Sequence, residues 1–118
     1  MKEPTFDQHG YPTEETLKAI SEWDSADLPG LFAFIRQAWE YSEYWQEKRH
    51  GVHIVHTCGW SGNESLISAF QENRLAWMLC WVQSRRGGHY VFRIPAYQLA
   101  TQPPDGTDGG AEGKEQEE

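Results

Sequence analysis

The chain has 118 residues, of which 38% are hydrophobic and 14% aromatic, so it can form one domain around one core. Its formal net charge of −8 is unevenly distributed, since residues 102–118 hold six acidic residues and one lysine. The rest of the chain is only mildly acidic, which argues against general electrostatic attraction to nucleic acid, and we expect no direct nucleic-acid binding. No run of 18 apolar residues and no signal-peptide pattern is present, so we expect no membrane association and a cytoplasmic location.

The first half of the chain predicts two helices after a short lead-in. Residues 1–10 contain few apolar side chains and are expected to be flexible. A first helix should begin after Thr13, whose side chain can cap it, with two glutamates in the first turn. A second helix is predicted over residues 28–44, because apolar side chains recur there at spacings of three and four.

The second half of the chain predicts three strands and one helix. They are a strand at 52–58, a helix that begins at Ser61, a strand at 75–83 and, after a turn at 85–88, an antiparallel strand at 89–94. The first two strands and the helix between them most simply form a parallel pair with a right-handed crossover. The order α-α-β-α-β-β therefore predicts an α+β fold with a small three-stranded mixed sheet packed with helices. We assign residues 11–100 to this single domain and residues 101–118 to a disordered acidic tail.

Two polar turns are expected to meet at one edge of this sheet. Parallel strands joined by a crossover helix end at the same edge, which also holds the start of the helix and is where such sheets usually bind ligands. Backbone amides at a helix start and arginine side chains both favour phosphate or carboxylate, and Trp60 or Tyr90 could stack on a planar ring. The candidate ligand-binding residues are Gly59, Trp60, Ser61, Gly62, Asn63, Glu64, Arg85, Arg86, His89 and Tyr90.

Each of these motifs also has a purely structural interpretation. Ser61 and Glu64 have the spacing of a helix capping box, and glycine-rich arginine turns are commonly solvated hairpins. The segment from Gly59 to Gly62 lacks the lysine of a nucleotide-binding phosphate loop. A ligand-binding site is therefore expected only if the two turns lie next to each other in the fold.

The sequence gives little support to catalysis or metal binding. Cys58 and Cys80 both lie in apolar strand-like segments, so we expect buried free thiols, although Cys58 with His89 could form a nucleophile–base pair. His53 and His56 should point to opposite faces of a strand, which prevents joint ligation of a metal. We expect no catalytic residue, no metal site and no cofactor. A small hydrolase or transferase remains an alternative.

Four segments of the chain are distinctive: residues 11–17, the GWSGNE motif at 59–64, Trp77 with Cys80 and Trp81, and the SRRGGHY motif at 84–90. Across residues 10–95 they resemble a group of small uncharacterised bacteriophage and prophage proteins. The resemblance implies an accessory protein that acts inside the bacterial host cell. Small phage proteins of this kind often counter host defence, either by sequestering a nucleotide signal or by occluding an effector such as a CRISPR complex.

We therefore expect a non-enzymatic, phage-type accessory protein that binds an anionic ligand, for example a nucleotide, at the edge formed by the two turns. The alternative is a protein–protein inhibitor of a host defence or nucleic-acid-processing complex. Such an inhibitor would use the acidic and aromatic surface of the chain.

Overall fold

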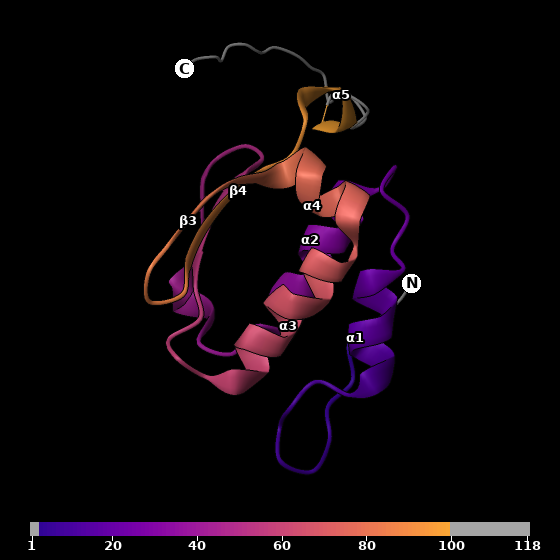
Figure 1. Cartoon of the computed structure of the whole chain (residues 1–118), viewed down its shortest axis with the longest axis vertical. Coiled ribbons are helices and arrows are strands. Elements are labelled where there is room, and N and C mark those ends of the chain that lie inside the picture. The colour runs from indigo at the N-terminus through magenta and orange to yellow at the C-terminus, as the bar shows by residue number, and fades with distance from the viewer. Residues whose placement is uncertain (1–2, 100–118) are drawn as a thin grey trace.

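A computed structural model of the chain describes residues 3–99, in which helices pack against one face of a sheet (Figure 1). The helices are α1 (Glu14–Ser21), α2 (Leu28–Ala38), α3 (Ser61–Glu72), α4 (Arg74–Cys80) and α5 (Ala96–Leu99), with a 3-10 turn, η1, at Ser42–Tyr44. The strands are β1 (Trp45–Arg49), β2 (Val52–His56), β3 (Trp81–Arg85) and β4 (His89–Arg93). The acidic tail expected at 101–118 lies outside the described residues.

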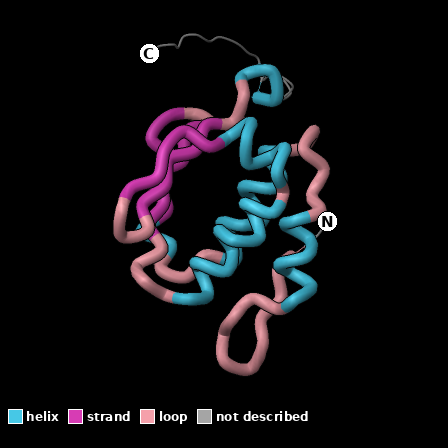
Figure 2. Tube along the Cα trace, in the orientation of Figure 1, coloured by secondary structure: helices cyan, strands magenta, loops and turns pink. Residues whose placement is uncertain are grey.

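The described strands form one antiparallel sheet in the order β1-β2-β4-β3, on one side of the molecule (Figure 2). The α+β class is confirmed, but the expected three-stranded mixed sheet and its element order are wrong in detail. β2 and β3 do run in the same direction. However, β4 lies between them and pairs with both, so they do not form the parallel pair that the crossover predicted.

The extra strand, β1, occupies a region where the sequence predicts the end of a helix and a polar break. α2 ends at Ala38 instead of continuing to residue 44, because Trp39 is extended and Tyr41 has a φ of 67°. Trp45 then pairs with Val55, and its side chain is buried on the inner face of the sheet. An aromatic side chain fits a half-buried strand as well as a helix, so the apolar spacing alone did not separate the two.

The strand predicted at 75–83 is mostly helix. Residues 74–80 form α4, and only residues 81–85 form β3. The segment is apolar at nearly every position, so an alternating pattern can be found in it whichever structure it adopts. The residues that α4 buries are Ala76 and Cys80, whose spacing of four is that of one face of a helix.

The start of α1 agrees with the prediction, because the Thr13 side chain accepts a hydrogen bond from the Thr16 amide. The segment before it is attached to this helix. The Thr5 amide donates to Thr16 Oγ1 at 2.8 Å, and Phe6 forms an isolated bridge with Pro12. Thr5 therefore lies against α1, and Tyr11 lies next to the start of α3.

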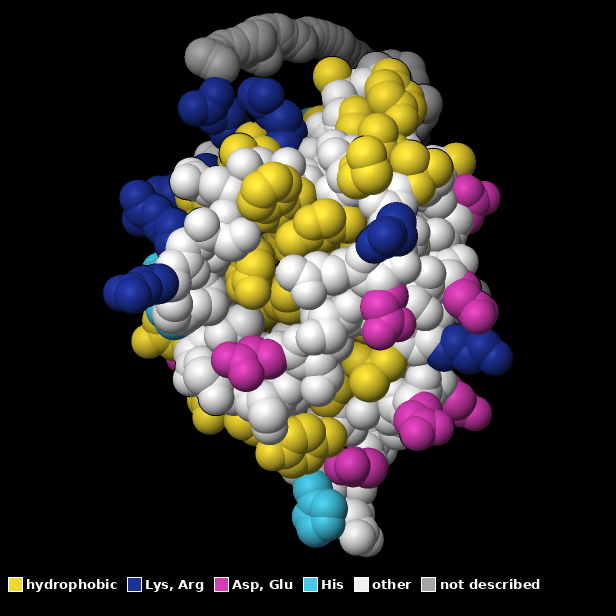
Figure 3. Space-filling model, in the orientation of Figure 1, with side chains coloured by type: hydrophobic (Ala, Val, Ile, Leu, Met, Phe, Trp, Pro, Cys, Tyr) yellow, Lys and Arg dark blue, Asp and Glu magenta, His cyan; other side chains and the backbone are white. Residues whose placement is uncertain are grey.

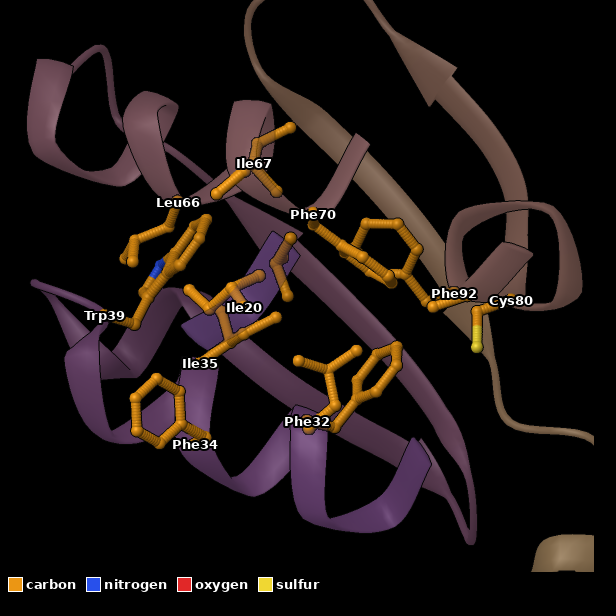
Figure 4. Packing of buried hydrophobic residues seen from close by; sticks show 14 of the residues in the cluster. Ile20, Phe32, Phe34, Ile35, Trp39, Leu66, Ile67, Phe70, Cys80 and Phe92 are labelled. Atoms are coloured by element: carbon orange, nitrogen blue, oxygen red, sulfur yellow. The ribbon is translucent and has the colours of Figure 1, made fainter. Parts of the chain in front are cut away.

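The core lies between the helices and the inner face of the sheet (Figure 4). Phe32 of α2, Phe70 of α3 and Phe92 of β4 meet there, with ring centroids 5.1–5.6 Å apart. Aromatic rings bury large areas, which explains how a chain with a modest apolar content forms a core. Among residues 3–99, no helix has the length and apolar character needed to cross a membrane.

Candidate functional site

The loop after β2 and the turn between β3 and β4 lie next to each other, as the sequence analysis expected. The Thr57 amide donates to the Gly88 carbonyl at 3.0 Å, and His56 pairs with His89 in the sheet. Gly88 has a φ of 86°, and a Cβ on it would lie only 2.1 Å from Thr57 Oγ1. Glycine at position 88 therefore allows both the turn and the close approach of the two segments.

The loop after β2 turns tightly toward α3. Cys58 and Gly59 both have positive φ, and the Trp60 amide donates to the Thr57 carbonyl at 3.1 Å. This conformation exposes the Cys58 side chain, so the prediction that both cysteines are buried is wrong for Cys58 and confirmed for Cys80. Cys58 comes after the last residue of β2, so the turn sets the direction of its side chain. The inward–outward alternation of side chains along the strand no longer applies at this position.

The structure gives Cys58 no activating partner. Its amide donates to His56 Nδ1 at 3.0 Å, and its thiol donates to the His56 carbonyl at 3.7 Å, so the His56 ring holds the backbone and does not act as a base on the thiol. Desolvation and the nearby carboxylate of Glu43 raise the pKa of the Cys58 thiol. A nucleophilic cysteine requires the opposite shift, and the pairing of Cys58 with His89 as nucleophile and base gains no support.

The start of α3 differs from the expected capping box. Trp60, not Ser61, is the N-cap residue, and it makes no side-chain capping bond. Ser61 Oγ instead contacts the Tyr11 hydroxyl at 3.2 Å, and the Glu64 carboxylate accepts from Thr57 Oγ1 at 3.4 Å. The Ser61, Gly62 and Asn63 amides lie in the first turn, where an α-helix supplies no carbonyl partner. Of these three residues only Ser61 is exposed, since Gly62 and Asn63 are buried, so the Ser61 amide is the one most open to an anion.

The position of the Trp60 ring requires a glycine at residue 62. A Cβ on Gly62 would lie 2.2 Å from the Trp60 ring, so the indole lies directly against the glycine. The ring also packs on Tyr11, with centroids 5.0 Å apart. Trp60 thus covers the first turn of α3 and remains partly exposed, while Tyr11 already occupies part of its surface.

Two of the predicted site residues have structural partners. Asn63 is fully buried, and its side chain binds backbone groups of Glu40 and Thr57. Tyr90 lies on the inner face of the sheet, where its ring stacks on Phe92. Neither side chain points toward the outer face, so their contribution to a ligand site is restricted to backbone atoms.

The outer end of the sheet carries a row of polar rings, of which the sequence analysis predicted His89 but not His56 or Tyr44. The His56 and His89 rings lie 3.9 Å apart, and Tyr44 of η1 contacts His56 at 5.9 Å. Arg85 pairs with His89 on the next strand, so the row continues across the sheet. The sequence signal for His56 was its position. It lies on the opposite face of the strand from the inward-facing His53, and it comes one residue before the loop that starts at Thr57.

His53 confirms that the histidines of β2 point to opposite faces. Its Nδ1 accepts from Trp45 Nε1 at 3.0 Å on the inner face, and burial lowers the pKa of this imidazole. Among the described residues, no group of three histidine, cysteine or acidic side chains could hold a metal ion.

The surface around the two loops favours anions on one side only. Arg85 and Arg86 are exposed and form no ion pair within the described part of the chain. On the other side, Ser61 and Glu64 begin a groove of about 620 Å³ between α1 and α3, which also contains Glu72. Two carboxylates against one lysine, Lys18, disfavour an anion in that groove, so we restrict the candidate site to the sheet side of the α3 start.

No protein-family model matches this chain, and the comparisons found no matching curated protein or solved structure.

Proposed function

We propose that this chain is a non-enzymatic binding protein for a phosphate- or carboxylate-bearing ligand, held where the loop after β2 meets the β3–β4 turn. The observation that carries the proposal is the backbone contact between Thr57 and Gly88. It brings the start of α3, the His56–His89 pair and two arginines that form no ion pair within residues 3–99 to one end of the sheet. These groups come from segments about thirty residues apart in the sequence.

The chemistry of this end suits an anion. The amides of the first turn of α3 and the positive end of its helix dipole attract negative charge. Arg85 and Arg86 can each pair with two oxygens of a phosphate or carboxylate. His56 Nδ1 accepts from the Cys58 amide, so its Nε2 carries the hydrogen and can donate to a ligand.

The resemblance to phage proteins supplies the biological part of the proposal. A phage-type accessory protein in the bacterial cytoplasm that binds an anionic signal, such as a nucleotide, would lower the free concentration of that signal. This role needs affinity and abundance but no turnover. It is therefore compatible with a thiol whose pKa is raised.

A thermal-shift screen with pyrophosphate, ATP and citrate tests the proposal. At a hundredfold excess over Kd, a ligand stabilises the folded protein by about 2.7 kcal/mol. We expect stabilisation of the wild type, and loss of most of it in the Arg85→Ala/Arg86→Ala variant. Arg74→Ala, which removes an exposed arginine from α4, should behave as the wild type. The proposal fails if no anion shifts the melting temperature, or if both variants respond alike.

The second candidate function is inhibition of a host protein complex, and a separate surface favours it. Several large apolar side chains are exposed on α4, β3 and α5, and Met78 is 76% exposed. The others are Leu75, Leu79, Trp81, Val82 and Tyr97. Figure 3 shows hydrophobic side chains gathered over the part of the molecule where Figure 1 shows α4 and α5. Exposed apolar patches commonly mark protein interfaces.

A pull-down from host lysate separates the two functions. If the protein inhibits a host complex through the apolar surface, the Arg85→Ala/Arg86→Ala variant should still capture the partner, and Met78→Glu should not. The reverse pattern would assign the interaction to the anion site instead.

A further inference from the structure

We propose that the ligand of this protein is a single-stranded nucleic acid that lies across the outer face of the sheet. The inference extends the proposed anion site and rests on it, because one end of the strand would occupy that site. It departs from the sequence-based expectation of no nucleic-acid binding, which considered the distribution of charge along the sequence and not its arrangement on the folded chain.

No helix of residues 3–99 covers the outer face, since the core and the helices lie on the other side of the sheet (Figures 1 and 2). We define the outer face by the outward side chains of the two central strands, which are Val52, Ile54, His56, His89, Val91 and Arg93. Their strand neighbours Phe92 and His53 are buried on the inner face, which fixes this assignment.

The cross-strand pairs arrange the outer face in three rows. At one end, Arg49 pairs with Val52, which pairs with Arg93. In the middle, Ile54 pairs with Val91 and forms an apolar strip. At the other end, His56 pairs with His89, which pairs with Arg85. The two end rows, which we call the cationic rows, thus contain Arg49 and Arg93 at one end and Arg85 at the other, and the apolar Ile54–Val91 pair lies between them, flanked by Gln46 and Gln83. The two rows are four residue steps apart along each strand, which corresponds to about 13 Å.

The charges of the described chain are segregated. Of its eight lysines and arginines, five belong to the strands or the β3–β4 turn: Lys48, Arg49, Arg85, Arg86 and Arg93. Of its twelve acidic residues, only Glu47 belongs to a strand, and its carboxylate accepts the Gly51 amide and lies 3.9 Å from the inward-facing His53. Figure 3 shows the dark blue side chains mainly on the sheet side and the magenta ones over the helices. The strands and the β3–β4 turn are therefore net positive in an acidic protein, with Glu43 of η1 as the carboxylate near Cys58.

Single-stranded nucleic acid matches these features better than other polyanions. Its phosphates can bind the two cationic rows, while its bases can pack on the apolar strip and on the Tyr44, His56 and His89 rings. A four-stranded sheet of this size has room for two or three bases. A duplex presents grooves that a flat sheet face cannot enter, and a purely acidic polypeptide such as polyglutamate has no flat aromatic rings to place on the strip.

Fluorescence anisotropy with labelled 12-nucleotide oligo-dT and oligo-U tests the inference on the full chain at about 50 mM salt. We expect binding that weakens with salt, with a slope of log K against log salt of about −2 for three phosphate contacts. Arg93→Glu lies far from the proposed anion site and should weaken binding at least tenfold. Arg74→Glu on α4 makes the same charge change outside the outer face and should leave it within twofold.

Three results would overturn the inference. One is the absence of oligonucleotide binding at low salt, and another is equal weakening by Arg93→Glu and Arg74→Glu. The third is equal competition by a polyglutamate peptide, which would show that the surface holds acidic polypeptide. Pyrophosphate stabilisation without oligonucleotide binding would leave the proposed function intact, whereas loss of both would remove the two together.

Discussion

Asn63 joins the start of α3 to the segment that follows α2: its side-chain oxygen accepts the Glu40 amide hydrogen at 2.9 Å, and its Nδ2 donates to the Glu40 carbonyl at 3.0 Å. The same Nδ2 also contacts the Thr57 carbonyl at 3.2 Å. One buried amide therefore fixes the loop after β2 relative to two helices. The position of the candidate site depends on this residue, although its side chain is not available to a ligand.

Replacement of Asn63 by alanine should destabilise the protein by roughly 2–4 kcal/mol, because it removes three hydrogen bonds and leaves the buried Thr57 carbonyl without this partner. Urea unfolding followed by circular dichroism measures the change. Glu72→Ala, at an exposed position of the same helix, should change the free energy of unfolding by no more than about 0.5 kcal/mol. A loss below about 0.5 kcal/mol for Asn63→Ala would mean that these hydrogen bonds do not hold the loop.

The contact between the two loops can be tested with a matched pair of glycine substitutions. Gly87 and Gly88 have nearly the same φ, 85° and 86°, but only a Cβ on Gly88 would meet another atom, Thr57 Oγ1. Both alanine variants should lose about 1–2 kcal/mol from the left-handed conformation. Gly88→Ala should lose at least about 1 kcal/mol more, since the overpacked contact must separate. Equal unfolding free energies for the two variants would contradict the close approach.

His53 should make stability depend on pH. Burial lowers its folded-state pKa below the ordinary 6.5, so the unfolded chain binds more protons as the pH falls through and below 6.5. The stabilisation is fully present above pH 6.5 and is lost as the pH falls toward the folded-state pKa. Protonation also places a hydrogen on Nδ1, which then cannot accept from Trp45 Nε1.

Urea unfolding at pH 5 and pH 8 measures this dependence in the wild type and in His53→Gln. We expect the variant to lose part of the difference between the two pH values. His50→Gln, which replaces an exposed histidine three residues earlier, should retain it. If the two variants show the same pH dependence, another group is responsible.

The two thiols should differ in reactivity. Cys58 is exposed, whereas Cys80 is buried in the core, where desolvation raises its pKa to about 12. A chromogenic disulfide reagent should therefore titrate one thiol in the native protein and two after unfolding. The raised pKa of Cys58 should also make it react more slowly than a free thiol. Rapid reaction at neutral pH would instead point to an activated cysteine.

The sequence predicted those parts of the fold that have specific local signals. Thr13 marks the start of α1, and Gly87 and Gly88 mark the β3–β4 hairpin, because caps and positive-φ turns depend on few neighbours. β1 was missed because four of its five residues are polar or charged, and α4 was missed because its segment is apolar at nearly every position. Whether Trp45 joins a strand depends on Val55 as a partner, which no local pattern shows.

In the candidate site, too, the residues in local motifs were predicted and those placed by long-range pairing were not. The two loops were expected to meet and do so, but through β4, which pairs directly with β2, and not through a parallel pair. The glycines and arginines were found because they form motifs. His56 and Tyr44 were missed because their role arises only from pairing across the sheet. The buried position of Asn63 likewise depends on Glu40, which is distant in sequence.

The most direct test of the anion site is an NMR titration of the 15N-labelled protein with pyrophosphate. We expect the largest saturable amide shifts at residues 56–62 and 85–89, together with shifts of the Arg85 and Arg86 side-chain signals. Shifts that are absent at millimolar pyrophosphate, or that are largest on α1 and α2, would contradict the account.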